Sequence, residues 1–141
     1  MDQRVSLITL GVADVAASKA FYGRLGWTPT LEVEDTLFFQ AGGIAVVLWG
    51  RDKLAADARV EDPGGWGGIT LSLNVRSTQE VDAVIEQARA AGARVSREPG
   101  PTDWGGYNGA FVDPDGHTWE IAHNPGFPLG SDGSLTIPTR G

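Results

Sequence analysis

The stretch VSLITLGVADVAASKAFYGRLG (residues 5–26) recurs in outline as ITLSLNVRSTQEVDAVIEQARAAG (residues 69–92). Each copy begins with a β-branched and aliphatic run, typical of a strand, and continues with the apolar spacing of an amphipathic helix. Asp14 and Ser77 stand where N-caps are needed, and Ser77 with Glu80 predicts a capping box. Each copy ends in a glycine suited to a left-handed helix stop. The repeat indicates two copies of one supersecondary unit.

More strand-like runs follow each predicted helix. We expect strands at residues 27–33, 36–40 and 44–49 in the first half, and at 93–97, about 108–112 and 117–122 in the second. Glycines 42 and 43 form one hairpin turn, and Asp113-Pro114-Asp115-Gly116 matches a type I turn. The order strand, helix, three strands therefore occurs twice, an α+β fold of two βαβββ modules. A ferredoxin-like fold is the alternative, but it needs more helices per strand.

The predicted domain is single and has four parts. They are module one at about residues 4–50, a glycine-rich linker at 51–68 with a short helix near 54–58, module two at about 69–125, and a C-terminal tail at 126–141. The tail holds apolar residues to bury against a neighbouring chain or a pocket mouth, namely Phe127, Leu129, Leu135 and Ile137.

The composition narrows the classes of partner. The chain has 141 residues, 11 basic and 18 acidic side chains and a net charge of −7, so it would repel nucleic acid. It has no cysteine, which excludes thiolate metal sites and disulfides. No apolar run approaches the roughly 20 residues that span a bilayer, and no signal-peptide pattern opens the chain. We therefore expect a cytoplasmic protein that binds neither nucleic acid nor membrane.

Two motifs carry a family resemblance. GVADVAASKAFYGRLGW (residues 11–27) and FVDPDGHTWEIAHNP (residues 111–125) resemble the vicinal oxygen chelate superfamily of glyoxalases, bleomycin resistance proteins and extradiol dioxygenases. The resemblance spans about residues 5–125. It implies an eight-stranded, half-open barrel around a pocket, and commonly a homodimer. In metal-dependent members, His, Gln or Glu on the first and last strand of each module holds a divalent metal.

This chain departs from that metal-binding pattern. Alignment of the two modules by their turns and helix caps places Leu7, Val47, Thr70 and Glu120 at the four ligand positions. Only Glu120 is a usual ligand, and a catalytic metal normally keeps about three protein ligands. We therefore expect no cofactor, with a divalent metal on Glu120 as the remaining alternative.

Side-chain alternation predicts a largely apolar pocket lining instead. Trp66 and Trp104 lie in glycine-rich loops, where they can stack on a planar ligand, cap the sheets or form a dimer contact. The predicted ligand-binding residues are Leu7, Thr9, Phe39, Val47, Trp49, Trp66, Thr70, Ser72, Trp104, Tyr107 and Glu120.

Two functions fit this pocket. The first is a non-catalytic protein that sequesters an aromatic natural product or antibiotic, as resistance members of the resembled family do. The alternative is a metal-dependent lyase, isomerase or dioxygenase of the glyoxalase type, in which Glu120 acts as general base or lone protein ligand.

Overall fold

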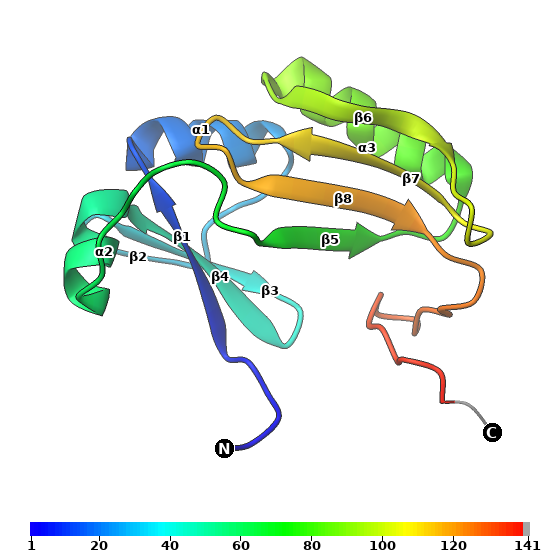
Figure 1. The fold of residues 1–141 in the computed structure, drawn as a ribbon, viewed down its shortest axis with the longest axis horizontal. Coiled ribbons are helices and arrows are strands. Elements are labelled where there is room, and N and C mark those ends of the chain that lie inside the picture. Colours follow the sequence, from blue (N-terminus) through cyan, green and yellow to red (C-terminus); the bar gives the residue numbers. More distant parts are fainter. Residues whose placement is uncertain (140–141) are drawn as a thin grey trace. The chain divides into compact units, whose positions relative to one another are not determined.

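A computed structural model describes residues 1–139 and divides the chain into two compact units, Met1–Gly67 and a second that begins at Gly68 (Figure 1). Each unit holds one four-stranded sheet, so the eight strands form two sheets. The predicted α+β class with two similar modules is confirmed. No helix within residues 1–139 is long and apolar enough to cross a membrane.

The first unit follows the predicted order. Its elements are β1 (Leu7–Val12), α1 (Val15–Arg24), β2 (Leu31–Val33), β3 (Thr36–Ala41), β4 (Ile44–Gly50) and α2 (Arg51–Ala58). The strand order in the sheet is β1-β4-β3-β2, with β1 parallel to β4 and the other pairs antiparallel. Helix α2 lies in the predicted linker, where it begins directly after β4 rather than at residue 54.

The second unit repeats this topology. Its elements are β5 (Thr70–Asn74), α3 (Thr78–Ala91), β6 (Arg94–Pro101), β7 (Tyr107–Val112) and β8 (Thr118–His123). The order is β5-β8-β7-β6, with β5 parallel to β8. Helix α3 runs along the sheet and contacts β6, β7 and β8 (Figure 1). The unpaired edge of β5 therefore corresponds to that of β1 in the first unit.

The predicted caps explain where the helices begin. Asp14 Oδ1 accepts a hydrogen bond from the Ala17 amide at 3.1 Å, and Ser77 Oγ accepts one from the Glu80 amide at 3.1 Å. The return bond of the capping box differs from the prediction, because Glu80 accepts from the Arg76 amide at 2.6 Å rather than from Ser77. Both helices thus begin with one orphan amide satisfied by an N-cap side chain.

Two strand predictions were wrong in length. The strand predicted at 27–33 is present only as Leu31–Val33, because Trp27 still belongs to the turn that ends α1, where its amide bonds to the Tyr22 carbonyl at 2.9 Å. Strand β6 reaches Pro101 instead of residue 97, since it continues to pair with β7 beyond a register shift. Both differences depend on pairing and backbone bonds that the residue pattern does not encode.

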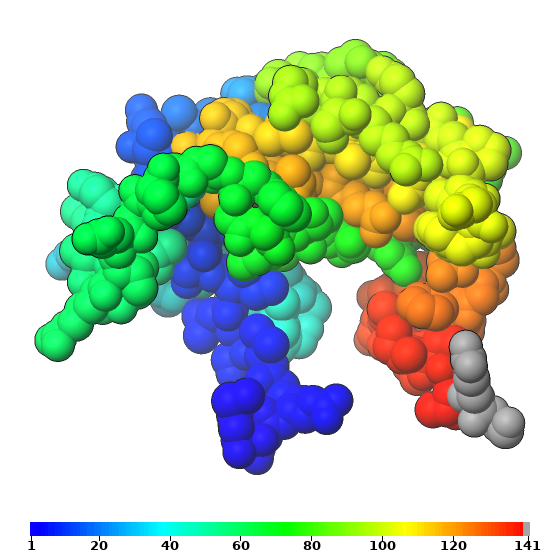
Figure 2. Space-filling model, in the orientation of Figure 1, coloured from blue at the N-terminus to red at the C-terminus, as the bar shows by residue number. Residues whose placement is uncertain are grey.

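Within the C-terminal tail, a short hairpin around residues 129–135 contacts its own unit, whereas the apolar residues Leu135 and Ile137 are exposed. Leu129 bridges Leu135, and the Gly130 amide donates to the Ser134 carbonyl at 2.8 Å. Arg76 Nη2 donates to the Gly130 carbonyl at 2.5 Å, which ties this hairpin to the loop before α3. The tail extends away from the orange segment that ends β8 (Figure 2). Arg140 and Gly141, which the tail prediction included, lie outside the described residues.

An ion pair between Arg51 and Asp62 connects the start of α2 to the loop that follows it. The Arg51 guanidinium donates to both carboxylate oxygens of Asp62, with 2.9 Å between Nη2 and Oδ1. The Gly64 amide donates to Asp62 as well, at 2.9 Å. The Arg51 hydrogen bonds, followed by that from Gly64, lower the pKa of Asp62 to about 2. The linker is therefore held by an interaction that requires an ionised carboxylate.

We expect this linkage to make the stability of the protein acid-sensitive. The folded pKa of Asp62 lies below its ordinary value of 3.8, so its contribution is present above that value and is lost as the pH falls toward about 2. Urea unfolding from pH 7 down to pH 2 should show the wild type converging with Asp62→Asn below about pH 4. Asp57→Asn, on exposed α2, is the charge-matched control. A wild-type advantage over Asp62→Asn that is constant across this range would contradict the assignment.

Candidate functional site

Glu120 lies in the middle of β8, on the face of the sheet turned away from α3. Its neighbour Ile121 pairs with Gly109, and a Cβ at Gly109 would lie 3.0 Å from Cγ1 of Ile85 on α3. Ile121 and Gly109 therefore face the helix. Because side chains alternate along a strand, Glu120 faces the opposite way.

Two neutral donors hold the Glu120 carboxylate in place. Ser72 Oγ donates to Oε1 at 3.0 Å, and Asn108 Nδ2 donates to Oε2 at 2.9 Å. Glu120 is half-buried, Ser72 is exposed and Asn108 is only 7% exposed. These contacts fix the direction of the carboxylate on a face that also carries Arg97, since Arg97 pairs with Ala110 and Ala110 pairs with Glu120.

Asn108 is a site residue that sequence reasoning missed. It pairs with Ala122 across the antiparallel ladder, two positions along from Glu120, and so shares its face. An asparagine at the expected start of β7, with the same alternation as Glu120, was the available signal. The sequence alone does not show that Asn108 lies beside Glu120, because that depends on the register of β7 against β8.

The parallel ladders identify the side chains that stand beside the two predicted ligand positions on β4 and β8. Ser72 is the register partner of Glu120, and Thr9 is the register partner of Val47. Leu7 and Thr70, the positions expected from counting back from the caps, lie two residues earlier on each strand, where they pair with Ala45 and Thr118. The neighbours on the first strands are therefore hydroxyl side chains.

This donor set does not fit a family-type metal. Val47 cannot bind a metal, and the Ser72 and Thr9 hydroxyls are poor substitutes for imidazole or carboxylate. Glu120 already accepts from two donors. In the part of the chain that the structure describes, no three His, Asp or Glu side chains gather closely enough to hold an ion.

The first unit carries the other predicted strand residues. Thr9, Val47 and Trp49 share the face turned away from α1, and Trp49 pairs with Gly11. The hydrogen bond from Lys53 is the main cause of a lowered pKa at Asp35, to which the Trp49 side chain also bonds. Trp49 is half-buried near the end of β4, and its hydrogen bond to Asp35 holds its side chain there.

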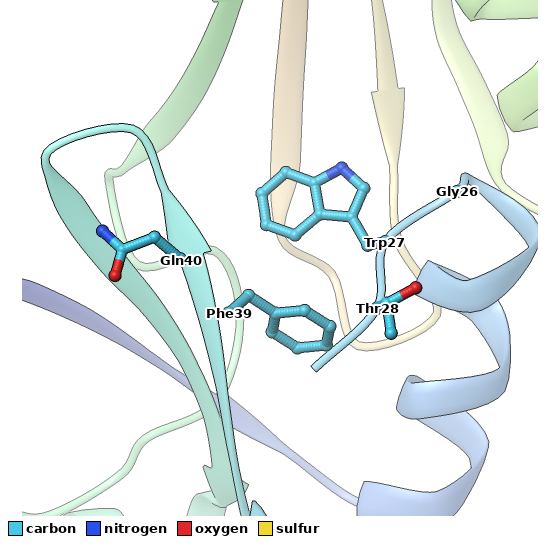
Figure 3. A pocket seen from close by; sticks show the side chains of 5 residues that line it. All are labelled: Gly26, Trp27, Thr28, Phe39 and Gln40. Atoms are coloured by element: carbon cyan, nitrogen blue, oxygen red, sulfur yellow. The ribbon is translucent and has the colours of Figure 1, made fainter. Parts of the chain in front are cut away.

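Phe39, predicted as a pocket residue, lies on the α1 face and forms one wall of a small pocket. Its ring centroid lies 5.5 Å from that of Trp27 and 6.3 Å from that of Tyr22. Phe39 is 2% exposed, so it belongs to the core of the first unit. The pocket encloses about 240 Å³ and is lined by Gly26, Trp27, Thr28, Phe39 and Gln40 (Figure 3).

The three remaining aromatic residues lie in different surroundings. Trp66 is 65% exposed in the linker. Trp104 is 50% exposed, yet its ring lies over Gly106, where a Cβ would come within 1.9 Å of Cζ3. The Tyr107 hydroxyl donates to Asp82 on α3 at 2.7 Å, and this bond raises the pKa of the tyrosine. Tyr107 is therefore directed at the helix and away from the Glu120 face.

Comparison with known proteins agrees with this fold. The Glyoxalase/Bleomycin resistance protein/Dioxygenase superfamily model matches residues 4–121. A glyoxalase-related enzyme from Fulvimarina pelagi is 39% identical with a TM-score of 0.91, and the match covers 97% of this chain and 99% of that one. A glyoxalase/bleomycin resistance protein/dioxygenase from Nocardioides is 25% identical with a TM-score of 0.73, over 92% and 91% of the two chains.

A third comparison concerns a curated relative. Lactoylglutathione lyase of Arabidopsis thaliana is 54% identical over 46 residues. These residues are 32% of this chain and only 16% of that protein. The family match spans most of the two modules, and the resemblance expected from the motifs is confirmed. The chain therefore belongs to the Glyoxalase/Bleomycin resistance protein/Dioxygenase superfamily.

Proposed function

We propose that the protein binds an aromatic small molecule, of the natural-product or antibiotic class, on the Glu120 face and without a metal. The observation that carries this proposal is the pair of neutral donors on the carboxylate, Ser72 and Asn108. Each donates to one oxygen of the carboxylate, and neither is a metal ligand of the usual kind. Glu120 is then free to act as a single polar anchor in a small-molecule site.

Two further features support binding of an aromatic body. The chain contains five tryptophans, and Trp104, which lies in the same unit as Glu120, is 50% exposed. An exposed aromatic side chain offers a large apolar surface with few rotatable bonds to immobilise. These tryptophans also supply an intrinsic fluorescence signal for titration.

The test combines metal analysis with fluorescence titration. Protein purified without chelators should contain far less than one equivalent of any transition metal, and aromatic antibiotics should quench its tryptophan fluorescence saturably. Glu120→Ala should weaken that binding by about tenfold or more, since hydrogen bonds to charged groups are worth roughly 1.5–3 kcal/mol. Glu61→Gln is the control, because it removes an exposed acidic charge elsewhere. Stoichiometric metal, or no saturable ligand in a broad panel, would overturn the proposal.

A second candidate function is a glyoxalase-type lyase, isomerase or dioxygenase that uses Glu120. Its support is the 39% identical relative, which is described as a glyoxalase-related enzyme. In this case the positioned carboxylate would take a proton from the substrate. Lactoylglutathione lyase assays with and without added nickel or zinc separate the candidates. Turnover that is lost in Glu120→Gln but kept in Glu61→Gln would favour the enzyme.

A further inference from the structure

Five side chains form a polar stripe on the Glu120 face of the second unit. The acceptor stripe, as we name it, consists of Thr70, Ser72, Asn108, Thr118 and Glu120. Thr70 pairs with Thr118 and Ser72 with Glu120 along the β5–β8 ladder. Asn108 joins them from β7 through its bond to Glu120. All five lie within one unit, so their arrangement depends on a single sheet.

The hydroxyl hydrogens of the stripe are used inside the sheet. Each hydroxyl has one hydrogen to donate. Thr118 Oγ1 donates to the Ile69 carbonyl at 3.0 Å, so Thr70 must supply the hydrogen in the 2.7 Å contact between the two threonine oxygens. Ser72 uses its hydrogen on Glu120 Oε1. A ligand that approaches this stripe therefore meets hydroxyl lone pairs rather than hydroxyl hydrogens.

The side-chain amide of Asn108 likewise uses a hydrogen inside the sheet. Nδ2 donates to Glu120 Oε2, and turning the amide around would set two acceptor oxygens against each other. Its Oδ1 is buried and has no hydrogen-bond partner among residues 1–139. Glu120 is the one charged member of the stripe, and Arg97 on β6 lies on the same face two strands away, because it pairs with Ala110, the partner of Glu120.

We propose that the acceptor stripe selects a ligand that carries a protonated amine. This inference rests on the proposed function, binding of a small molecule at Glu120, and names the chemical group that Glu120 recognises. An ammonium group offers three donors, no acceptor and a positive charge, which complements a surface of acceptor oxygens. A net charge of −7 attracts the same ligand at longer range and repels an anionic one.

The test compares three probes with one ring system on the wild-type protein, so that it does not depend on any variant folding. They are 2-naphthylmethylamine, 2-naphthylmethanol and 2-naphthoate, titrated at neutral pH while the backbone amide signals of Ser72 and Glu120 are followed by NMR. The amine should bind about tenfold or more tighter than the alcohol, and the carboxylate more weakly than both. These shifts should saturate at the β5–β8 pair.

Variants then assign the selectivity to the stripe. Glu120→Gln should lower the amine affinity to that of the alcohol, whereas Glu61→Gln, which removes the same charge at an exposed position, should change it by less than about twofold. Equal binding of the three probes at Glu120 would overturn the amine selectivity and leave the proposed binding function standing. Failure of every probe to bind would contradict both.

Discussion

Phe39→Ala should lower the free energy of unfolding by about 3–5 kcal/mol, because truncation of a buried phenylalanine removes its apolar contacts and leaves a cavity. Phe39 is 2% exposed and packs between Tyr22 at the end of α1 and Trp27 beyond it. Its pair on β4, Val46, is buried as well. The loss would therefore fall on the centre of the first unit's core. Urea unfolding monitored by circular dichroism measures it.

Phe38→Ala is the matched control for this loss. Phe38 is the next residue on β3, has the same side chain and is half-buried on the opposite face, where it pairs with Val47. Its truncation removes less buried surface and should cost clearly less stability. If the two variants were equally stable, Phe39 would not be the core residue that its burial indicates. If Phe39→Ala stayed fully stable and lost only ligand binding, the pocket role expected from the sequence would hold instead.

Phe39 also shows where sequence reasoning is strong and where it fails. The repeat, the caps at Asp14 and Ser77 and the glycine turns are encoded by neighbouring residues, so they predicted the modules correctly. The face on which a strand residue lies depends on register, and a shift of one residue exchanges the two faces. The run Thr36–Ala41 has two adjacent phenylalanines, which gives no clean alternation. The burial of Phe39 rather than Phe38 therefore could not be predicted from the pattern.

The candidate site divides in the same way. Glu120 was predicted because the FVDPDGHTWE motif fixes its place in the chain, and β8 places it where expected. The neighbours of Glu120 were harder to predict, since they come from two other strands. The offset from the helix caps placed Thr70 at the ligand position of the fifth strand, and the ladder shows that Ser72 is the register partner of Glu120. Asn108 required the register of a third strand. Local motifs thus predicted the charged group, and tertiary pairing determines what it contacts.

The second large effect on the free energy of unfolding is expected where α3 packs on its sheet. Ile85 is fully buried, and Ile85→Ala should cost about 2–5 kcal/mol through cavity formation. Gly109→Ala should cost about 1–3 kcal/mol for the opposite reason. A Cβ at Gly109 would lie 3.0 Å from Ile85 Cγ1 and 3.2 Å from the Arg97 carbonyl oxygen, a backbone atom that cannot easily move away.

The double variant tests whether these two costs come from one contact. In Ile85→Ala with Gly109→Ala, the new methyl group at residue 109 enters the space left by the isoleucine, so the combined loss should be smaller than the sum of the single losses by about 0.5–3 kcal/mol. Ala88→Gly, elsewhere on the buried face of α3, paired with Gly109→Ala gives the control cycle, and its losses should add more nearly. Additive losses for Ile85 and Gly109 would show that the helix does not pack directly on this glycine. A coupling confined to that pair would establish that the absence of a side chain at residue 109 lets α3 pack closely on this face of the sheet. Asn108 and Glu120 lie on the other face of β7 and β8.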